Sequence, residues 1–208
     1  MSRINRLCAA ALCAAGLGSF ATRALAVDVT LGDQDFTDGQ LITLPDFNNA
    51  SVGEPVPFDR FYGSDPIAGN VYNQSWTFNY APTAVPAGTI RLGLFDDDSG
   101  ASGSQLSAFT VDGVDLTALL NTAMEAAANP HSIVRVYTLP LPSTTFGVLA
   151  DGSATFTLTL SGPSLGSTGK FPGNGAGSDF ATLSIVPEPA TPSVALCGAA
   201  LALIRRRK

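Results

Sequence analysis

Runs of alternating hydrophobic and polar residues dominate the middle of this sequence. In residues 70–80, Trp76, Phe78 and Tyr80 fall on one side of an extended chain, and serine, threonine and asparagine fall on the other. Residues 154–160 repeat the pattern, with phenylalanine and leucine alternating with threonine. A period of two is the period of a β-strand that buries one face. Both segments are therefore predicted to be half-buried strands, with the aromatic row in the core.

Gly, Pro, Asn, Asp and Ser divide the rest of the middle section into short segments, which is typical of antiparallel all-β folds. Two Asp-Gly pairs, at 112–113 and 151–152, predict tight hairpin turns. Two stretches rich in Gly and Pro or Ser, residues 47–69 and 161–178, are predicted to be largely loop. Further strands or extended segments are predicted at residues 27–31, 40–44, 89–95, 107–111, 114–116, 132–139, 145–149 and 180–186.

One segment has the period of a helix instead. Across residues 116–127, leucine, methionine and alanine recur at spacings of three and four, so they share one face. Asp115 or Thr117 caps the start of this helix, and Asn129-Pro130 ends it. The whole pattern predicts an all-β domain, a β-sandwich of jelly-roll-like arrangement with one short helix.

The first 26 residues are predicted to be a secretory signal peptide. Arg3 and Arg6 form a basic start, and residues 7–20 are small and apolar. Residues 24–26, Ala-Leu-Ala, form a small-residue cleavage site. The domain that follows is therefore expected to be exported.

The C-terminal segment, residues 187–208, has three parts. It opens with Pro187-Glu188-Pro189, which is held extended because proline fixes φ. An uncharged, mostly apolar run follows at 192–204, shorter than the roughly 20 residues of a full membrane span. A block of four cations closes the chain: Arg205, Arg206, Arg207 and Lys208. Such cations favour the cytoplasmic side, so the segment predicts a transient transmembrane helix at the inner membrane.

This three-part segment resembles the PEP-CTERM sorting signal of exported bacterial proteins. The resemblance covers about the last tenth of the chain and implies cleavage by an exosortase, a membrane protease. The protein then passes to the cell surface or the extracellular matrix. The partners implied are the exosortase, the secretion machinery and, at the destination, exopolysaccharide. The chain is thus divided into a signal peptide (1–26), a β-sandwich domain (27–186) and a sorting segment (187–208).

Removing both end segments changes the charge and the cysteine content. The whole chain has a formal net charge of −6, but residues 27–186 hold four basic residues against 16 acidic ones, which gives −12. Such a domain repels nucleic acid and anionic lipid. The three cysteines, Cys8, Cys13 and Cys197, all lie in the end segments. Disulfides, cysteine–zinc sites and thiol catalysis are thus excluded for the domain.

Three adjacent carboxylates, Asp96, Asp97 and Asp98, directly follow the predicted strand 89–95. Adjacent carboxylates repel one another unless they are solvated or bind a cation, and oxygen ligands of this kind suit Ca²⁺. The run and the Ser-Gly turn after it resemble a calcium loop of C2-type β-sandwiches, in which other loops add carboxylates. A calcium site and a solvated acidic turn are the two interpretations. The nearest further carboxylates in the sequence are Asp33, Asp35, Asp59 and Asp65.

The sequence shows no catalytic constellation. His131, the single histidine, lacks an accompanying Gly-x-Ser-x-Gly motif and is interpreted as a surface polar residue. The leading hypothesis is a non-enzymatic exported protein of the cell surface or matrix, without catalytic residues. The alternative is a calcium-dependent carbohydrate- or surface-binding module. A secreted hydrolase is a third hypothesis, and its mark would be a deep cleft with two facing carboxylates or with His131 beside a serine.

Overall fold

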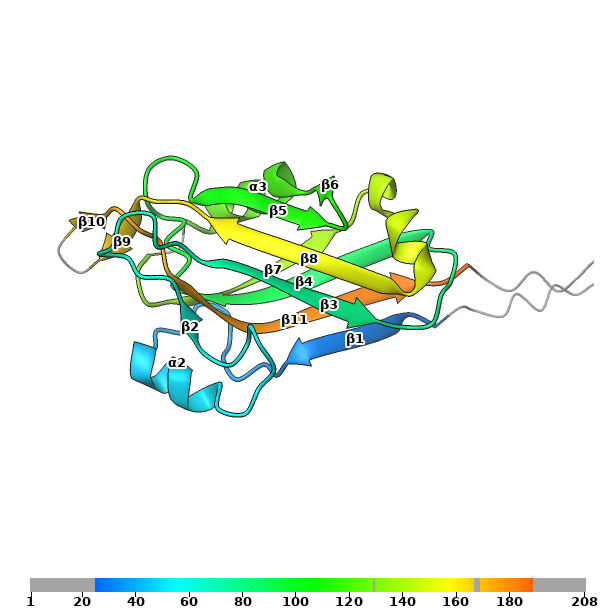
Figure 1. The fold of residues 1–208 in the computed structure, drawn as a ribbon, viewed down its shortest axis with the longest axis horizontal. Coiled ribbons are helices and arrows are strands. Elements are labelled where there is room, and N and C mark those ends of the chain that lie inside the picture. The colour runs from blue at the N-terminus through cyan, green and yellow to red at the C-terminus, as the bar shows by residue number, and fades with distance from the viewer. Residues whose placement is uncertain (1–24, 129, 167–168, 189–208) are drawn as a thin grey trace, which may run out of the picture. The chain divides into compact units, whose positions relative to one another are not determined.

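The computed structural model describes residues 25–128, 130–166 and 169–188, of which Leu25–Glu188 forms one compact unit. Most of the predicted signal peptide and sorting segment lie outside the described residues. Two antiparallel sheets pack face to face (Figure 1). The elements are β1 (Val27–Gly32), α2 (Leu44–Ala50), β2 (Phe61–Tyr62), β3 (Asn73–Asn79), β4 (Ala87–Phe95), β5 (Leu106–Val111), β6 (Val114–Asp115), α3 (Thr117–Ala127), β7 (Val134–Pro140), the 3₁₀ turns η1 (Ser143–Thr145) and η2 (Val148–Asp151), β8 (Ser153–Leu160), β9 (Ser164–Gly166), β10 (Gly169–Phe171) and β11 (Ala176–Val186).

The strand order alternates between the two sheets. One sheet has the order β1-β11-β4-β7, with β2 paired to β11, and the other has the order β3-β8-β5-β6. Leaving out β2, β9 and β10 and numbering the remaining strands along the chain gives 1-8-3-6 and 2-7-4-5. The chain therefore changes sheet at every connection between these strands except the β5–β6 hairpin. The prediction of a mostly β, sandwich-like domain is confirmed.

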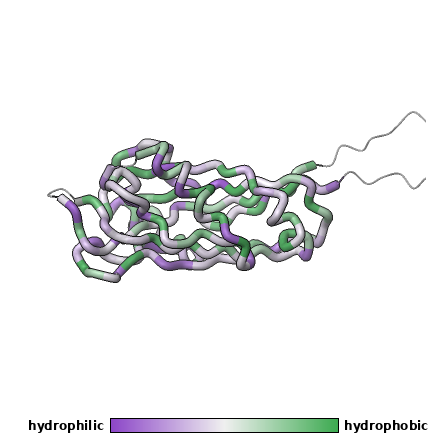
Figure 2. Tube along the Cα trace, turned by 90° about the horizontal axis from the view of Figure 1, so that it is seen from above, coloured by the Kyte–Doolittle hydropathy of each residue, from purple (hydrophilic) through white to green (hydrophobic). Residues whose placement is uncertain are grey.

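The core between the sheets comes from the predicted alternation. Trp76 and Phe78 of β3 are buried, as are Phe109 of β5 and Phe156 of β8. The Phe156 ring centroid lies 5.7 Å from those of Phe78 and Phe109 and 6.1 Å from that of Trp76. Figure 2 shows hydrophobic and hydrophilic positions interleaved along the length of the domain. Burial of this aromatic group contributes strongly to sheet packing, because each such side chain removes roughly 150–250 Å² from water.

A smaller cluster of aromatic side chains lies beneath α2, at the end of β4. Phe47 of α2 stacks on Phe95, with ring centroids 5.1 Å apart, and Phe36 stacks on Phe47 at 6.2 Å. A capping box holds the start of α2: the backbone N–H of Asp46 donates to Thr43 Oγ1, and the Asp46 side chain accepts from the Thr43 backbone N–H. Through the stacking of Phe47 on Phe95, α2 packs against the end of β4, directly before the acidic run.

Several expectations for the loops and the helix count were wrong. The described residues contain two α-helices, because α2 begins at Leu44 within segments expected to be extended or loop. Residues 145–149 lie in 3₁₀ turns rather than in a strand, so the hairpin expected at 151–152 is absent. Residues 161–178 contain the β9–β10 hairpin and the start of β11. Local hydrogen bonds and contacts with the sandwich override the apolar pattern in these segments.

Both ends of the described chain leave the domain together. In the β1–β11 pair Val27 lies opposite Ile185, and Figures 1 and 2 show both chain ends at one end of the sandwich. The acidic run lies at the other end, because β4 pairs with β11 from Ala87, opposite Val186, to Phe95, opposite Gly177. The nine residues of β4 separate the two ends by about 30 Å.

Within the residues described, no helix has the length and apolarity needed to cross a bilayer.

Candidate functional site

The acidic run leaves β4 in an unusual backbone conformation. Asp96 and Asp98 have φ angles of 60° and 55°, and Ser132, in the facing segment before β7, has a φ of 65°. Residues with side chains seldom adopt this left-handed region, and positions that do so concentrate at functional sites. All three aspartates are nonetheless buried, with exposed fractions of 5% or less. The run is therefore not a solvated acidic turn.

Asp97 points away from its two neighbours. Its Oδ2 accepts a hydrogen bond of 2.6 Å from the Tyr137 hydroxyl, and its Oδ1 accepts one of 3.1 Å from the Ser99 N–H. Burial and the adjacent Asp97 carboxylate raise the pKa of Tyr137, so this hydroxyl stays protonated and continues to donate. Asp97 thus links the acidic run to β7 inside the sandwich.

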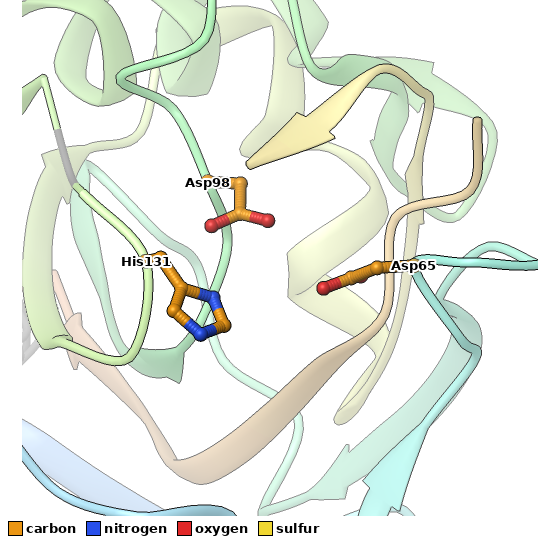
Figure 3. Close-up of side chains that lie close together, drawn as sticks. All are labelled: Asp65, Asp98 and His131. Carbon is orange, nitrogen blue, oxygen red and sulfur yellow. The ribbon is translucent and has the colours of Figure 1, made fainter. Parts of the chain in front are cut away.

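Asp65, Asp98 and His131 come together from three loops. Asp65 lies between β2 and β3, Asp98 follows β4, and His131 precedes β7. Each offers one ligand atom, and these atoms all lie within 4.8 Å of one another. Figure 3 shows the three side chains directed toward a shared space. This is the arrangement of a candidate metal site.

Backbone donors hold two carboxylates of the cluster in place. Asp65 Oδ1 accepts from the Gly175 N–H at 2.8 Å, and Asp98 Oδ2 accepts from the Leu165 N–H at 2.8 Å. The second oxygen of Asp98, Oδ1, is buried and has no hydrogen-bond partner in the described part of the chain. One oxygen of Asp98 is thus fixed by protein and the other is left open.

Asp96 lies beside the imidazole ring of His131. Its Oδ1 accepts a 2.5 Å hydrogen bond from the Ser132 N–H and lies 3.0 Å from His131 Nδ1. That contact has the distance of an ion pair but not hydrogen-bond alignment, because Nδ1 has no hydrogen-bond partner among the described residues. The ring therefore lies beside a carboxylate, and its Nδ1 makes no hydrogen bond within the described part of the chain.

Burial dominates the electrostatics of these carboxyl groups. Desolvation raises the pKa of Asp98 to about 9, with the neighbouring Asp96 carboxylate as the next cause. Desolvation also raises the pKa of Asp96 and of Asp65. Three carboxyl groups that resist ionisation together gain from any cation that neutralises them.

A pocket of about 700 Å³ opens beside the cluster. Asp65, Asp96 and His131 lie in its wall, together with Ser132. The rest of its lining is mainly apolar and comes from the start of α2 and the segment before it, from β2 and the loop after it, and from the end of β4: Leu41, Ile42, Leu44, Phe61, Pro66 and Phe95. A concave, mainly apolar site with a few convergent polar groups is typical of small-ligand binding.

The other carboxylates named from the sequence divide between two further places. Asp33 and Asp35 form a separate group with Glu54, again with ligand atoms within 4.8 Å of one another. There, desolvation and then the side-chain hydrogen bond with Asp33 raise the pKa of Glu54 to about 8. Asp59 accepts a 2.5 Å hydrogen bond from the Tyr62 hydroxyl and takes no part in either group. Of the four, Asp65 alone joins part of the acidic run.

His131 has a larger place in this site than the sequence suggested. Its side chain is 39% exposed, and the ring lies in the pocket wall beside Asp96 rather than out on the surface. The pairing of β4 with β7 places Phe95 opposite Val134. It so brings the residues before β7, His131 among them, alongside Asp96. The signal available in the sequence was the two strands, 89–95 and 132–139, since pairing them brings His131 to Asp96.

Comparisons with known proteins give a weak structural likeness alone. The chain matches no protein-family profile and no curated protein. Among solved structures it is similar to BuGH86wt in complex with neoagarooctaose, with a TM-score of 0.33 and 17% sequence identity. The match covers 77% of this chain and 19% of that chain, so this chain spans about a fifth of that protein. A likeness this low assigns no function.

Proposed function

We propose that this is an exported bacterial protein of the cell surface or extracellular matrix, processed through the PEP-CTERM and exosortase route. Its β-sandwich is a non-enzymatic module that binds carbohydrate in the pocket beside His131. The observation that carries this proposal is the position of that pocket, at the end of β4 away from both chain ends. A domain attached through its C-terminal segment would present such a pocket outward.

The beginning of the sorting motif supports processing after folding. Strand β11 ends at Val186, and Pro187-Glu188 follow directly, with Glu188 exposed. The Glu188 N–H donates to the Ala84 carbonyl at 3.1 Å, which is the last hydrogen bond seen along the described chain. A protease that cuts after this point would leave every strand of the sandwich intact.

The lining of the pocket supports a sugar as the ligand. A sugar ring offers C–H groups on its face and hydroxyls at its edge. Phe61 and Leu41 supply apolar surface, and Asp96, His131 and Ser132 supply polar atoms. The strand order 1-8-3-6 and 2-7-4-5 is that of a jelly roll, an architecture that lectin domains share. Because fold alone does not decide function, the proposal of carbohydrate binding is argued from the pocket and not from the strand order.

A hydrolase is the second candidate function. The observation that favours it is that the pocket wall holds three carboxylates, Asp46, Asp65 and Asp96, and places His131 beside Ser132. Binding without cleavage is favoured because Asp98, the carboxyl group with the most strongly raised pKa in the cluster, is fully buried and does not line the pocket. A general acid must reach the bond that it protonates.

Export is tested by fractionating cells that express the full-length chain. The protein is expected at the cell surface or in the medium, in a form shortened at its C-terminus. Replacing Pro187, Glu188 and Pro189 together by alanine is expected to leave an uncut form in the membrane fraction, because the sorting motif is lost. Glu125→Ala, an exposed change on α3, is the control and should be processed normally. Uncut wild-type protein in the cytoplasm would contradict export.

Carbohydrate binding is tested with Leu41→Ser. Leu41 is 72% exposed at the pocket, so the change should leave stability unaltered while removing apolar contact with the ligand. We expect affinity for the producing cell's exopolysaccharide to fall about tenfold, measured by sedimentation with the insoluble polymer. Val52→Ser, a change at a 77% exposed position outside this pocket, is the matched control.

Equal binding by wild type and Leu41→Ser would exclude this pocket as the sugar site. Release of new reducing ends from the polymer, lost in Asp65→Asn, would instead favour the hydrolase.

A further inference from the structure

We propose that Asp65, Asp98 and His131 bind a first-row transition-metal ion, Zn²⁺ in the first place, at the base of the pocket. This metal site goes beyond sugar binding and does not depend on it. The inference rests on the geometry of the three side chains, one buried oxygen without a partner and the charge around the cluster.

The geometry is close to that of a bound ion. A tetrahedral zinc ion with ligands at 2.0–2.1 Å places its ligand atoms about 3.3 Å apart. The three ligand atoms here lie within 4.8 Å of one another. Rotation of the His131 side chain would close most of that difference, since Asp65 and Asp98 are each held through one oxygen by a backbone N–H, that of Gly175 and that of Leu165.

Asp98 Oδ1 is the atom that most needs a partner. Asp98 is fully buried, with an exposed fraction of 0%, and this oxygen has no hydrogen-bond donor in the described part of the chain. Buried carboxylate oxygens are nearly always hydrogen-bonded, paired with a cation or bound to a metal. In Figure 3 the Asp98 carboxylate is directed toward the space between His131 and Asp65.

No basic side chain of the described residues neutralises the cluster. Arg60 pairs with Asp59, Arg135 pairs with Asp38, and Arg91 lies over the Phe180 ring. Lys170 donates to Ser102. Since each of the four basic residues in the domain is engaged elsewhere, the charges of Asp65, Asp96 and Asp98 are compensated by His131, removed by protonation, or neutralised by a bound cation.

The ligand set selects the kind of ion. Calcium is bound by six to eight oxygen atoms, roughly, whereas imidazole nitrogen suits zinc and its neighbours in the first transition row. One imidazole and two carboxylates form a three-ligand set, as in zinc sites that keep an open position. Asp96 lies behind the set, with its Oδ1 3.0 Å from His131 Nδ1, where a carboxylate can support a ligating imidazole.

The open coordination position would face the pocket. Asp65 and His131 line the pocket wall, while Asp98 closes the site from the buried side. A ligand hydroxyl or a water molecule would occupy that position. The three carboxylates on which Ca²⁺ was expected, those of Asp96, Asp97 and Asp98, do not converge on one point, because Asp97 is turned toward Tyr137.

The test is thermal unfolding of the full-length protein after treatment with a chelator. Zn²⁺ at about 100 times its Kd is expected to raise the melting temperature by about 5–10 °C, with one ion per chain by elemental analysis. His131→Ala and Asp98→Asn should each abolish the rise while remaining folded, which their unfolding without metal will show. Glu54→Gln, in the separate acidic group, is the matched control and should keep the full response.

Two results would overturn the metal site. One is a zinc response that His131→Ala leaves unchanged, or no response to zinc at all. The other is a calcium response larger than the zinc response and retained in His131→Ala, which would indicate a site made of oxygen ligands alone.

Discussion

Replacing Phe156 by alanine is expected to lower the free energy of unfolding by about 3–5 kcal/mol. Phe156 is fully buried at the centre of the core, and its ring packs between Trp76, Phe78 and Phe109. The loss combines the transfer of an aromatic ring to water with the cavity that remains, because three neighbouring rings from two other strands cannot all move inward. Denaturant unfolding of the full-length protein measures the change.

Thr157→Ala is the matched control for that change. Thr157 follows Phe156 on β8 and points to the other face, where its Oγ1 shares a 2.8 Å hydrogen bond with the Ser75 hydroxyl at the surface. Its loss should lower the free energy of unfolding by less than about 1 kcal/mol. Similar effects of the two substitutions would mean that the face assignment of β8 is incorrect.

Asp98→Asn is expected to stabilise the metal-free protein by roughly 2–4 kcal/mol at pH 7. Burial and then Asp96 raise the pKa of Asp98 to about 9, so folding at neutral pH must either protonate this group or bury its charge. Asparagine keeps an acceptor oxygen for the Leu165 N–H. Its amide nitrogen replaces the oxygen without a partner and can donate to the neighbouring carboxylates.

The stability difference between wild type and Asp98→Asn should change with pH in a definite direction. The folded pKa of about 9 lies above the ordinary value of 3.8, so between these pH values the folded state binds a proton that the unfolded state has released. Wild-type stability relative to Asp98→Asn is therefore greatest below pH 4 and falls as the pH rises toward 9. Unfolding curves at pH 4, 7 and 8.5, recorded with a chelator, measure this gap.

Asp28→Asn serves as the control, because Asp28 is exposed on β1 and the change should stay within about 0.5 kcal/mol of wild type. A substitution at Asp98 that destabilised the metal-free protein at every pH would indicate that the carboxylate is already satisfied within the chain.

The strands that could be predicted are those with one buried face. In β8 every second residue is buried; β3 shows this alternation from Ser75 onward and β4 before its last residues. A period of two survives in the sequence because burial acts on each side chain separately. The predicted helix α3 also formed, with Leu120 and Met124 buried on one face.

The short helix α2 was missed because seven residues are too few to show a helical period. Its signal was chemical instead: Thr43 and Asp46 form the capping box, and Pro45 occupies the first turn. The strand expected at 145–149 failed for a related reason. Leu149, in the 3₁₀ turn η2, is buried without being part of a strand. Its carbonyl accepts a 2.8 Å hydrogen bond from the Tyr80 hydroxyl.

The candidate site could be predicted only in part. The acidic run was found because three adjacent carboxylates are rare, but its members separate: Asp97 faces Tyr137, while Asp98 faces Asp65 and His131. Composition cannot reveal that division, which follows from the left-handed turns at Asp96 and Asp98. The convergence with His131 needed the pairing of β4 with β7, a contact between segments far apart in the sequence.

X-ray absorption at the zinc edge, on zinc-loaded full-length protein, examines the metal centre most directly. The ligand set of Asp65, Asp98 and His131 predicts four nitrogen and oxygen neighbours at about 2.0–2.1 Å, with the outer-shell signal of one imidazole. The imidazole signal should disappear in His131→Ala. A shell of six oxygens without imidazole, or the same spectrum in His131→Ala, would contradict a metal centre built on these three residues.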